Sequence, residues 1–190
     1  MKCTNMFDID AFSSLPISLK DSDYVDLLLL LSGLKKAVRI GNNSVKIYNE
    51  MSFWCKRFKY VDTVSCSGWM YISRYACFSK FVSAIDDLRF SHSYILGLVL
   101  GYPSCCSRQI ADIGEQFIDK WEKNLVNSGN FNGDYSLINP GGYLAGNSLI
   151  SHVPCSCKCE KSLVIAKSAL KIIKAYRNYD CMSRWQKWFE

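Results

Sequence analysis

Two short cysteine-rich segments place the strongest constraint on how this chain can fold. The first is PSCC at 103–106 and the second is HVPCSCKC at 152–159. In both, a proline is followed by cysteines and then by apolar residues at helical spacing, and proline favours the first turn of a helix because its ring fixes φ there. Each segment therefore predicts a helix that begins at its cysteines. The two helix starts must meet if the cysteines are to form one site.

The position of the cysteines at helix starts also predicts their chemistry. Unpaired backbone N–H groups and the positive end of the helix dipole favour thiolate over thiol, and the thiolate is the form that binds metal or attacks a substrate. Cys155 and Cys159 are four residues apart and share a helix face, whereas Cys157 points away from it. We therefore expect the sulfur of Cys105 or Cys106 to lie within a few ångströms of Cys155 and Cys159.

The candidate metal ligands are Cys105, Cys106, Cys155, Cys159 and His152. Four thiolates could enclose one tetrahedral Zn²⁺ or an iron–sulfur cluster. Adjacent cysteines rarely bind the same ion because successive side chains diverge, so one of the pair together with Cys155 and Cys159 is an equal alternative. His152 would then be the fourth ligand, or an acid/base group that moves a proton near neutral pH. The candidate catalytic residues are His152, Cys105 and Cys106.

Five other cysteines stand alone among apolar or aromatic neighbours, and we expect them to be buried: Cys3, Cys55, Cys66, Cys77 and Cys181.

The N-terminus lacks the apolar core of a secretory signal, which predicts a cytoplasmic protein whose ten cysteines form no disulfide framework. The longest leucine run, Leu27 to Leu31, is far shorter than the roughly 20 residues of a membrane span, so we expect no membrane partner.

The hydrophobic pattern predicts one α+β domain over residues 1–190, mainly helical with a small antiparallel sheet. Apolar residues make up 49% of the chain, which is enough for a sizeable core. We expect residues 1–85 to hold a helix and the sheet, and residues 86–190 to form a helical half with the cysteine segments. The periodicity predicts helices at 21–38, 78–100, 104–125 and 156–176, strands at 45–49, 58–66 and 68–75, and a glycine-rich loop at 128–148.

The cysteine segments also resemble a known pair of motifs. In a prokaryotic family of domains of unknown function, a Leu-Gly-Tyr-Pro-x-Cys-Cys segment precedes a His-x-Pro-Cys-Ser-x-x-Cys segment, and this chain is similar to that pattern over residues 95–176. The positions that match are Gly101, Tyr102, Pro103, Cys105, Cys106, His152, Pro154, Cys155, Ser156 and Cys159. The resemblance implies that these residues form the site and implies no particular activity.

These features support three functional hypotheses. The first is an enzyme with a cysteine-bound metal or iron–sulfur centre, in sulfur handling or specialised metabolism, that acts on an unidentified small molecule. The second is a zinc-stabilised binding module for RNA or an acidic protein, although the net charge of +6 is spread along the chain and makes nucleic acid the less favoured partner. The third is a thiol oxidoreductase, which the absence of a Cys-x-x-Cys redox motif disfavours. A closed four-cysteine site favours the module, and an open metal position facing a pocket favours the enzyme.

Overall fold

The computed structural model describes residues 7–41, 44–88, 92–144 and 148–188. Its helices are α1 Ile9–Ser13, α2 Asp21–Leu31, α3 Val45–Phe58, α4 Ala76–Asp87, α5 Ser93–Val99, α6 Ser104–Ile113, α7 Ile118–Ser128, α8 Gly141–Leu144 and α9 Glu160–Ala175. Short 3-10 helices are η1 Glu115–Phe117, η2 Gly133–Ile138 and η3 Asp180–Trp188, and the strands are β1 Ala37–Ile40, β2 Val61–Val64 and β3 Met70–Ser73. The predicted mainly helical α+β fold is confirmed.

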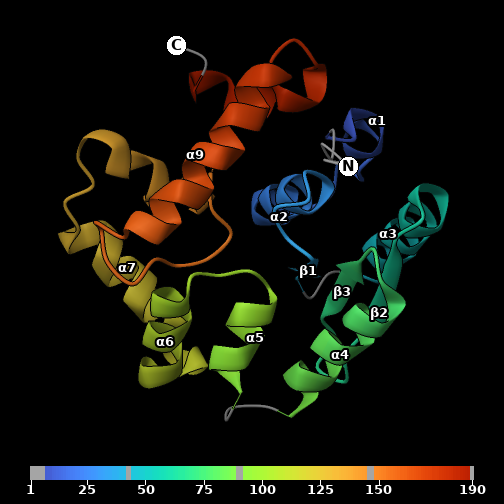
Figure 1. Ribbon diagram of the computed structural model, residues 1–190, viewed down its shortest axis with the longest axis horizontal. Coiled ribbons are helices and arrows are strands. Elements are labelled where there is room, and N and C mark those ends of the chain that lie inside the picture. Colours follow the sequence, from blue (N-terminus) through green and yellow to red (C-terminus); the bar gives the residue numbers. More distant parts are fainter. Residues whose placement is uncertain (1–6, 42–43, 89–91, 145–147, 189–190) are drawn as a thin grey trace, which may run out of the picture.

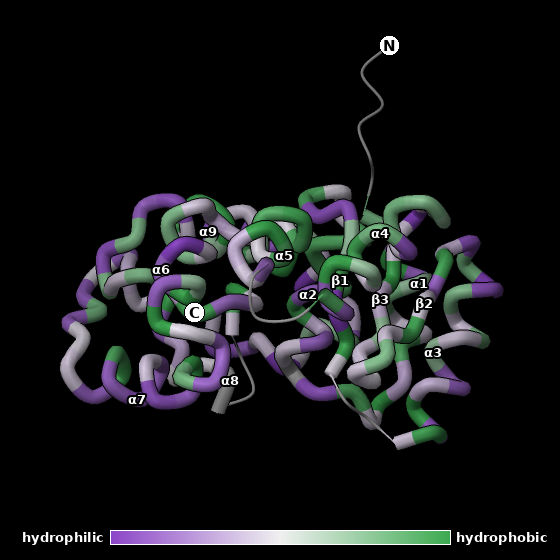
Figure 2. The backbone as a smooth tube through the Cα atoms, turned by 90° about the horizontal axis from the view of Figure 1, so that it is seen from below, coloured by the Kyte–Doolittle hydropathy of each residue, from purple (hydrophilic) through white to green (hydrophobic). Residues whose placement is uncertain are grey.

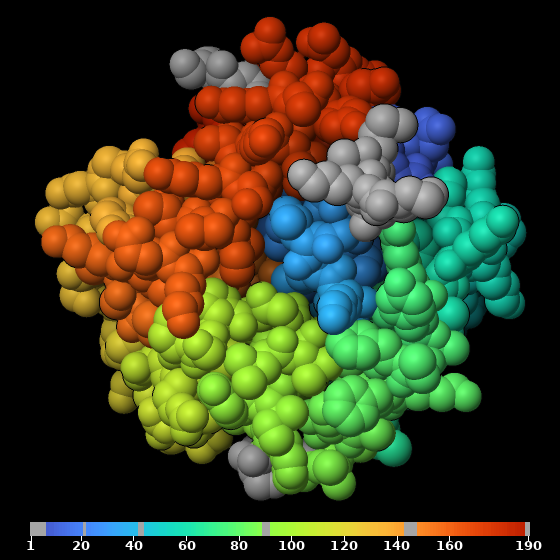
Figure 3. All heavy atoms as spheres, viewed as in Figure 1, coloured from blue at the N-terminus to red at the C-terminus, as the bar shows by residue number. Residues whose placement is uncertain are grey.

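The leucine run lies in α2 at the centre of the molecule. Leu27 to Leu31 are each at most 1% exposed, because α2 packs against α1, β1 and α9. A helix that is apolar on every face is stable only when it is covered on every side. Figure 3 shows the blue atoms of this segment in the middle of the face, with orange, yellow-green and green segments around them. As Figure 1 shows, α2 lies between α9 on one side and the sheet with α3 on the other.

The sheet is a three-stranded antiparallel sheet in the order β1-β3-β2. Ile72 of β3 pairs with Val38 of β1 on one side and with Asp62 of β2 on the other. Helix α4 packs on the sheet and forms a small second core with it, which includes Tyr71 and Val82. The strands predicted at 58–66 and 68–75 are therefore present, each shorter than expected.

The strand predicted at 45–49 is wrong, because this segment is the first turn and a half of α3. Its β-branched and aromatic residues resemble a strand only in a short window. The apolar spacing continues through Met51, Trp54 and Cys55, all buried, and that spacing is helical. The helix ends at Lys59, which adopts the left-handed conformation with φ of 60°.

All four predicted helices have different bounds from those expected. The helix predicted at 21–38 ends at Leu31, and Ala37 and Val38 belong to β1. The pattern at 78–100 is divided between α4 and α5, and residues 89–91 lie outside the described part of the chain. The pattern at 104–125 is divided at Gly114, whose φ of 87° suits glycine and interrupts a helix. The helix expected from 156 begins only at Glu160. The loop predicted at 128–148 contains η2 and α8, and η2 packs against α9.

Helices α5 and α6 bring the start of α6 close to the centre of the molecule. Figure 2 shows α5 as mainly hydrophobic and α7 as mainly hydrophilic, in agreement with their places between α4 and α6 and at the outer edge. A Cβ added at Gly97 of α5 would lie 2.4 Å from Ser107 Oγ of α6, so glycine is required for this close approach. Within the described segments, no helix combines the length and apolar character needed to cross a bilayer.

A buried ion pair links α2 to the cysteine segments. Lys35 Nζ lies 2.5 Å from Asp26 Oδ1 and 2.6 Å from Ser151 Oγ, and it also lies 4.4 Å from the centre of the Tyr102 ring. Burial lowers the pKa of Lys35, and the nearby Asp26 carboxylate opposes that shift. Lys35 thus joins α2 to both cysteine segments, because Tyr102 directly precedes the segment at 103–106 and Ser151 directly precedes the segment at 152–159.

We expect the two members of this pair to depend on each other for stability. Lys35→Met leaves a buried carboxylate without its partner and should lower the free energy of unfolding by about 3–5 kcal/mol. The double change Lys35→Met with Asp26→Leu removes both charges and should recover most of that loss. Urea denaturation of the two single variants and the double variant measures this coupling, and losses that simply add would contradict it.

Candidate metal centre

Four cysteine sulfurs from two distant parts of the sequence meet in one cluster. The Sγ atoms of Cys105, Cys106, Cys155 and Cys159 all lie within 4.8 Å of one another. Cys159 Sγ is 3.7 Å from Cys105 Sγ and 3.6 Å from Cys106 Sγ, and the sulfurs of the adjacent pair are 3.9 Å apart. We call these four residues the thiol cluster. Its donors are at metal-binding distance, as the convergence predicted from the two helix starts requires.

The first pair is positioned by the beginning of α6. Pro103 is the N-cap of this helix, so Cys105 and Cys106 lie in its first turn, as predicted. The sequence argument that adjacent side chains diverge does not hold at this position. Side chains on a helix lean toward its N-terminus, so both sulfurs can reach the space beyond the first turn. Both members of the pair therefore belong to the thiol cluster.

The second pair is positioned by a turn rather than by a helix. Cys159 is the N-cap of α9, and Cys155 lies in the preceding loop, so the expectation that both share a helix face is wrong. The backbone N–H of Cys159 donates to the carbonyl of Ser156, and the backbone N–H of Cys155 donates to Cys106 Sγ at 3.4 Å. This turn brings both sulfurs toward α6. Cys157 is half-buried and lies outside the thiol cluster.

The close sulfurs strongly perturb one another's protonation. Hydrogen bonds from Cys106, and then from Ser162 and Cys105, lower the pKa of Cys159 to about 4. A hydrogen bond to Cys159 and burial raise the pKa of Cys106, and burial raises that of Cys155 to about 12. The close contacts thus favour a thiolate at Cys159 and neutral thiols at Cys106 and Cys155. Ionisation of all four would require a cation among them.

His152 lies beside the thiol cluster and is not a member of it. Its Nε2 hydrogen-bonds Ser162 Oγ at 2.8 Å, and that hydroxyl donates to Cys159 Sγ at 3.3 Å. Its ring packs against Tyr102, with 5.3 Å between centroids, and its Nδ1 has no partner within the described residues. The imidazole therefore reaches the sulfurs through Ser162. The sequence signal for Ser162 is its place three residues after Cys159, in the first turn of α9.

The five isolated cysteines do not share one environment. Cys55 is buried, as expected, and burial raises its pKa. Cys66 and Cys77 are exposed and Cys181 is half-buried, so the burial predicted for these three is wrong. Cys66 lies in the turn between β2 and β3, and Cys77 lies in the first turn of α4. Apolar neighbours in the sequence do not bury a side chain at either position. Cys3 lies outside the described residues.

Comparison with protein-family models, with curated proteins and with solved structures finds no match to this chain. The resemblance to the prokaryotic family with paired motifs therefore stays a prediction. The assignment of the site depends on the geometry of the chain's own residues.

The buried imidazole predicts how stability depends on pH. Burial, and then the nearby Lys35, lower the pKa of His152 to about 3, whereas an unfolded histidine titrates near 6.5. Between those values the unfolded chain binds one more proton than the folded protein, so stability falls as pH falls, by up to about 1.4 kcal/mol per pH unit. His152→Gln removes this contribution. Urea denaturation between pH 7 and pH 5 should show a shallower loss for the variant, and parallel curves would contradict the assignment.

Proposed function

We propose that the thiol cluster binds one Zn²⁺ ion in a closed tetrahedral site and that the protein is a zinc-stabilised binding module. The observation that carries this proposal is the set of sulfur–sulfur distances, 3.6, 3.7 and 3.9 Å. With Zn–S bonds of about 2.3 Å, the edge of a tetrahedron of sulfurs around one zinc ion is about 3.8 Å. The arrangement needs little adjustment to accept the ion.

The same distances favour a single ion over an iron–sulfur cluster. In a cluster the thiolates bind different iron atoms, which stand between them and hold the sulfurs farther apart than one ion does. All four sulfurs here lie within 4.8 Å of one another. A cluster would therefore require the start of α6 to move away from the loop before α9, and a zinc ion would not.

The number of sulfurs favours a structural zinc over a catalytic one. Catalytic zinc sites have three protein ligands and an open position, whereas four thiolates fill a tetrahedral site. Cys106 is only 1% exposed, and the imidazole nitrogen of His152 that faces the site is engaged by Ser162. These contacts favour the binding module over the enzyme with chemistry at the metal. They also give His152 a positioning role in place of the ligand role expected from the sequence.

A structural zinc here would join parts of the chain that few other contacts join. Cys106 and Cys155 are 49 residues apart, and closing a loop of that length with a metal removes conformational freedom from the unfolded chain. The segment that the zinc holds includes Ser151 and His152, which contact Lys35 and Ser162. The zinc would thus hold the second cysteine segment against α6 and α2.

The aromatic C-terminal segment is not arranged to stack on bases. Trp185 is buried against Phe12, with 6.1 Å between ring centroids, and its Nε1 donates to the carbonyl of Ser148. The guanidinium of Arg184 lies 3.4 Å from the centre of the Tyr24 ring. Because Trp185 is buried and Arg184 is half-buried against Tyr24, these two side chains give no support to RNA as the partner.

We expect the purified protein to contain one zinc ion per chain and no iron or sulfide. Cys159→Ser should remove the zinc, because a neutral hydroxyl replaces the thiolate that contacts both members of the adjacent pair. Cys157→Ser, in the same loop but outside the thiol cluster, is the matched control and should keep the full zinc content. Elemental analysis of both variants measures this.

Two results would contradict the zinc assignment. Iron with acid-labile sulfide and a brown colour in protein prepared without oxygen would show a cluster. Full zinc content in Cys159→Ser, or loss of zinc in Cys157→Ser, would show that other residues bind the ion.

A further inference from the structure

Two adjoining cavities form one cleft between the sheet side of the molecule and the later helices. The inner cavity has a volume of about 150 Å³ and the outer one about 390 Å³. They share five wall residues, which come from β1, α5, η1 and α7: Arg39, Ser93, Leu96, Glu115 and Ile118. The cleft therefore has walls from both halves of the chain.

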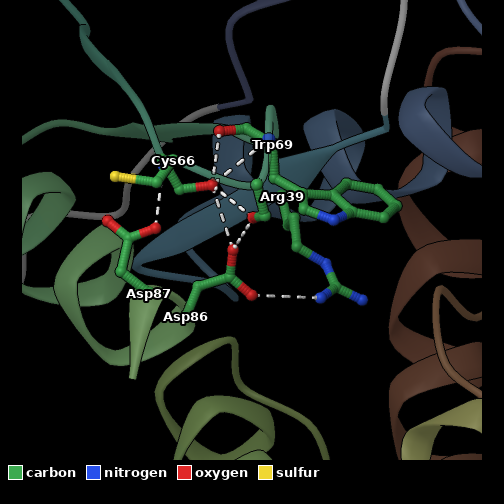
Figure 4. Close-up of polar contacts among 7 residues, drawn as sticks. Arg39, Cys66, Trp69, Asp86 and Asp87 are labelled. Carbon is green, nitrogen blue, oxygen red and sulfur yellow. Dashed lines mark hydrogen bonds and ion pairs between the residues drawn. The ribbon is translucent and has the colours of Figure 1, made fainter. Parts of the chain in front are cut away.

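A guanidinium is held at the junction of the two cavities. Arg39 stacks on the Trp69 ring at 4.4 Å, and its Nη1 lies 3.8 Å from Asp86 Oδ1. Figure 4 shows the guanidinium beside Trp69 and Asp86, beyond the turn that carries Cys66. The carboxylate of Asp86 also accepts hydrogen bonds from Ser65 and Ser67, at 3.0 and 2.6 Å, which hold it in place. At 3.8 Å its contact with Arg39 is longer than a hydrogen bond, so Asp86 does not saturate the guanidinium, and Arg39 lines both cavities.

The inner cavity contains two buried polar atoms without partners in the described residues. They are His152 Nδ1 and Ser107 Oγ, on side chains of residues that are 7% and 3% exposed. Buried polar atoms in proteins are nearly always hydrogen-bonded, so a polar group that enters this cavity can bond to both atoms. Leu100, Ile110 and Val153 form the apolar part of this wall.

The charges that line the cleft are of both signs. Arg39 is the cation, and Glu115 is the carboxylate that lines both cavities with it. The outer cavity adds Asp86 and Asp119. A simple anion would meet this excess of carboxylates, and a simple cation would meet the guanidinium. A molecule with one group of each sign matches both.

We propose that this cleft binds a free amino acid or a closely related amino-carboxylate. The carboxylate pairs with Arg39, the ammonium group pairs with Glu115, and the side chain enters the inner cavity, where its polar end meets His152 Nδ1 and Ser107 Oγ. The proposal depends on the cleft and not on which metal the thiol cluster binds.

Binding is tested with the protein as purified, with its metal content recorded, and with each of the twenty standard amino acids as the probe. At least one should raise the melting temperature with increasing concentration and bind saturably in calorimetry. For that amino acid, the analogues that lack the amine or the carboxylate should each bind at least about tenfold more weakly. No binding by any of the twenty would overturn the proposal. Equal binding of the carboxylate-only analogue would also overturn it, in favour of an anion site.

Two variants locate the binding and separate it from the metal. Arg39→Gln should weaken binding at least about tenfold, and Lys56→Gln, an exposed charge on α3 away from the cleft, should leave it unchanged. Glu115 is half-buried, so the Glu115→Gln variant should fold normally. In this variant the affinity for the amino acid should come closer to the affinity for its carboxylate-only analogue. Zinc content should stay the same in all three variants. Unchanged binding in both Arg39→Gln and Glu115→Gln would place the ligand elsewhere and refute the proposal.

Discussion

Four sulfur atoms within 4.8 Å of one another can all carry negative charge only beside a cation, and much of this structure depends on that constraint. Without a cation, the hydrogen bonds of its neighbours lower the pKa of Cys159 and favour the thiolate there. With Zn²⁺, each sulfur becomes a thiolate and the repulsion becomes attraction to one centre. A cation in the thiol cluster would therefore stabilise the contact between two segments that are far apart in sequence.

The contacts around the thiol cluster extend its effect to the rest of the molecule. Ser162 connects the sulfurs to His152, and the His152 ring packs on Tyr102. The ammonium group of Lys35 lies over the Tyr102 ring and hydrogen-bonds Ser151 and Asp26 of α2. A continuous set of polar and aromatic contacts thus runs from the sulfurs to α2. These contacts also place His152 in the wall of the inner cavity, which Cys106 of the thiol cluster lines as well. The thiol cluster and the cleft therefore adjoin each other.

The sequence predicts the fold class, the central helix and the convergence of the cysteines, because each depends on a strong local signal. The leucine run is apolar on every face, and Pro103 starts α6 where expected. The predictions fail where the structure of a segment is decided by residues outside the short window that the pattern covers. Pro154 does not start a helix, because the chain makes a turn between Ser156 and Cys159 and α9 begins only at Glu160. The segment at 45–49 becomes helical because its apolar face continues to Cys55.

The role of His152 shows the limit of reasoning from spacing alone. As the only histidine in either cysteine segment, it is expected to be a ligand or an acid/base group. Its orientation is decided by Ser162 and Tyr102, which belong to other segments. Arg39 and Glu115 are likewise far apart in sequence and carry no shared motif, so the cleft that they line emerges only from the folded chain.

The most direct test of the central claim is X-ray absorption at the zinc edge of the purified protein, which reports the atoms bonded to the ion. The zinc proposal predicts four sulfurs at about 2.3 Å and no nitrogen or oxygen ligand. A spectrum fitted by three sulfurs with one nitrogen or oxygen at about 2.0–2.1 Å would contradict the closed four-cysteine site and restore an open or histidine-bound metal.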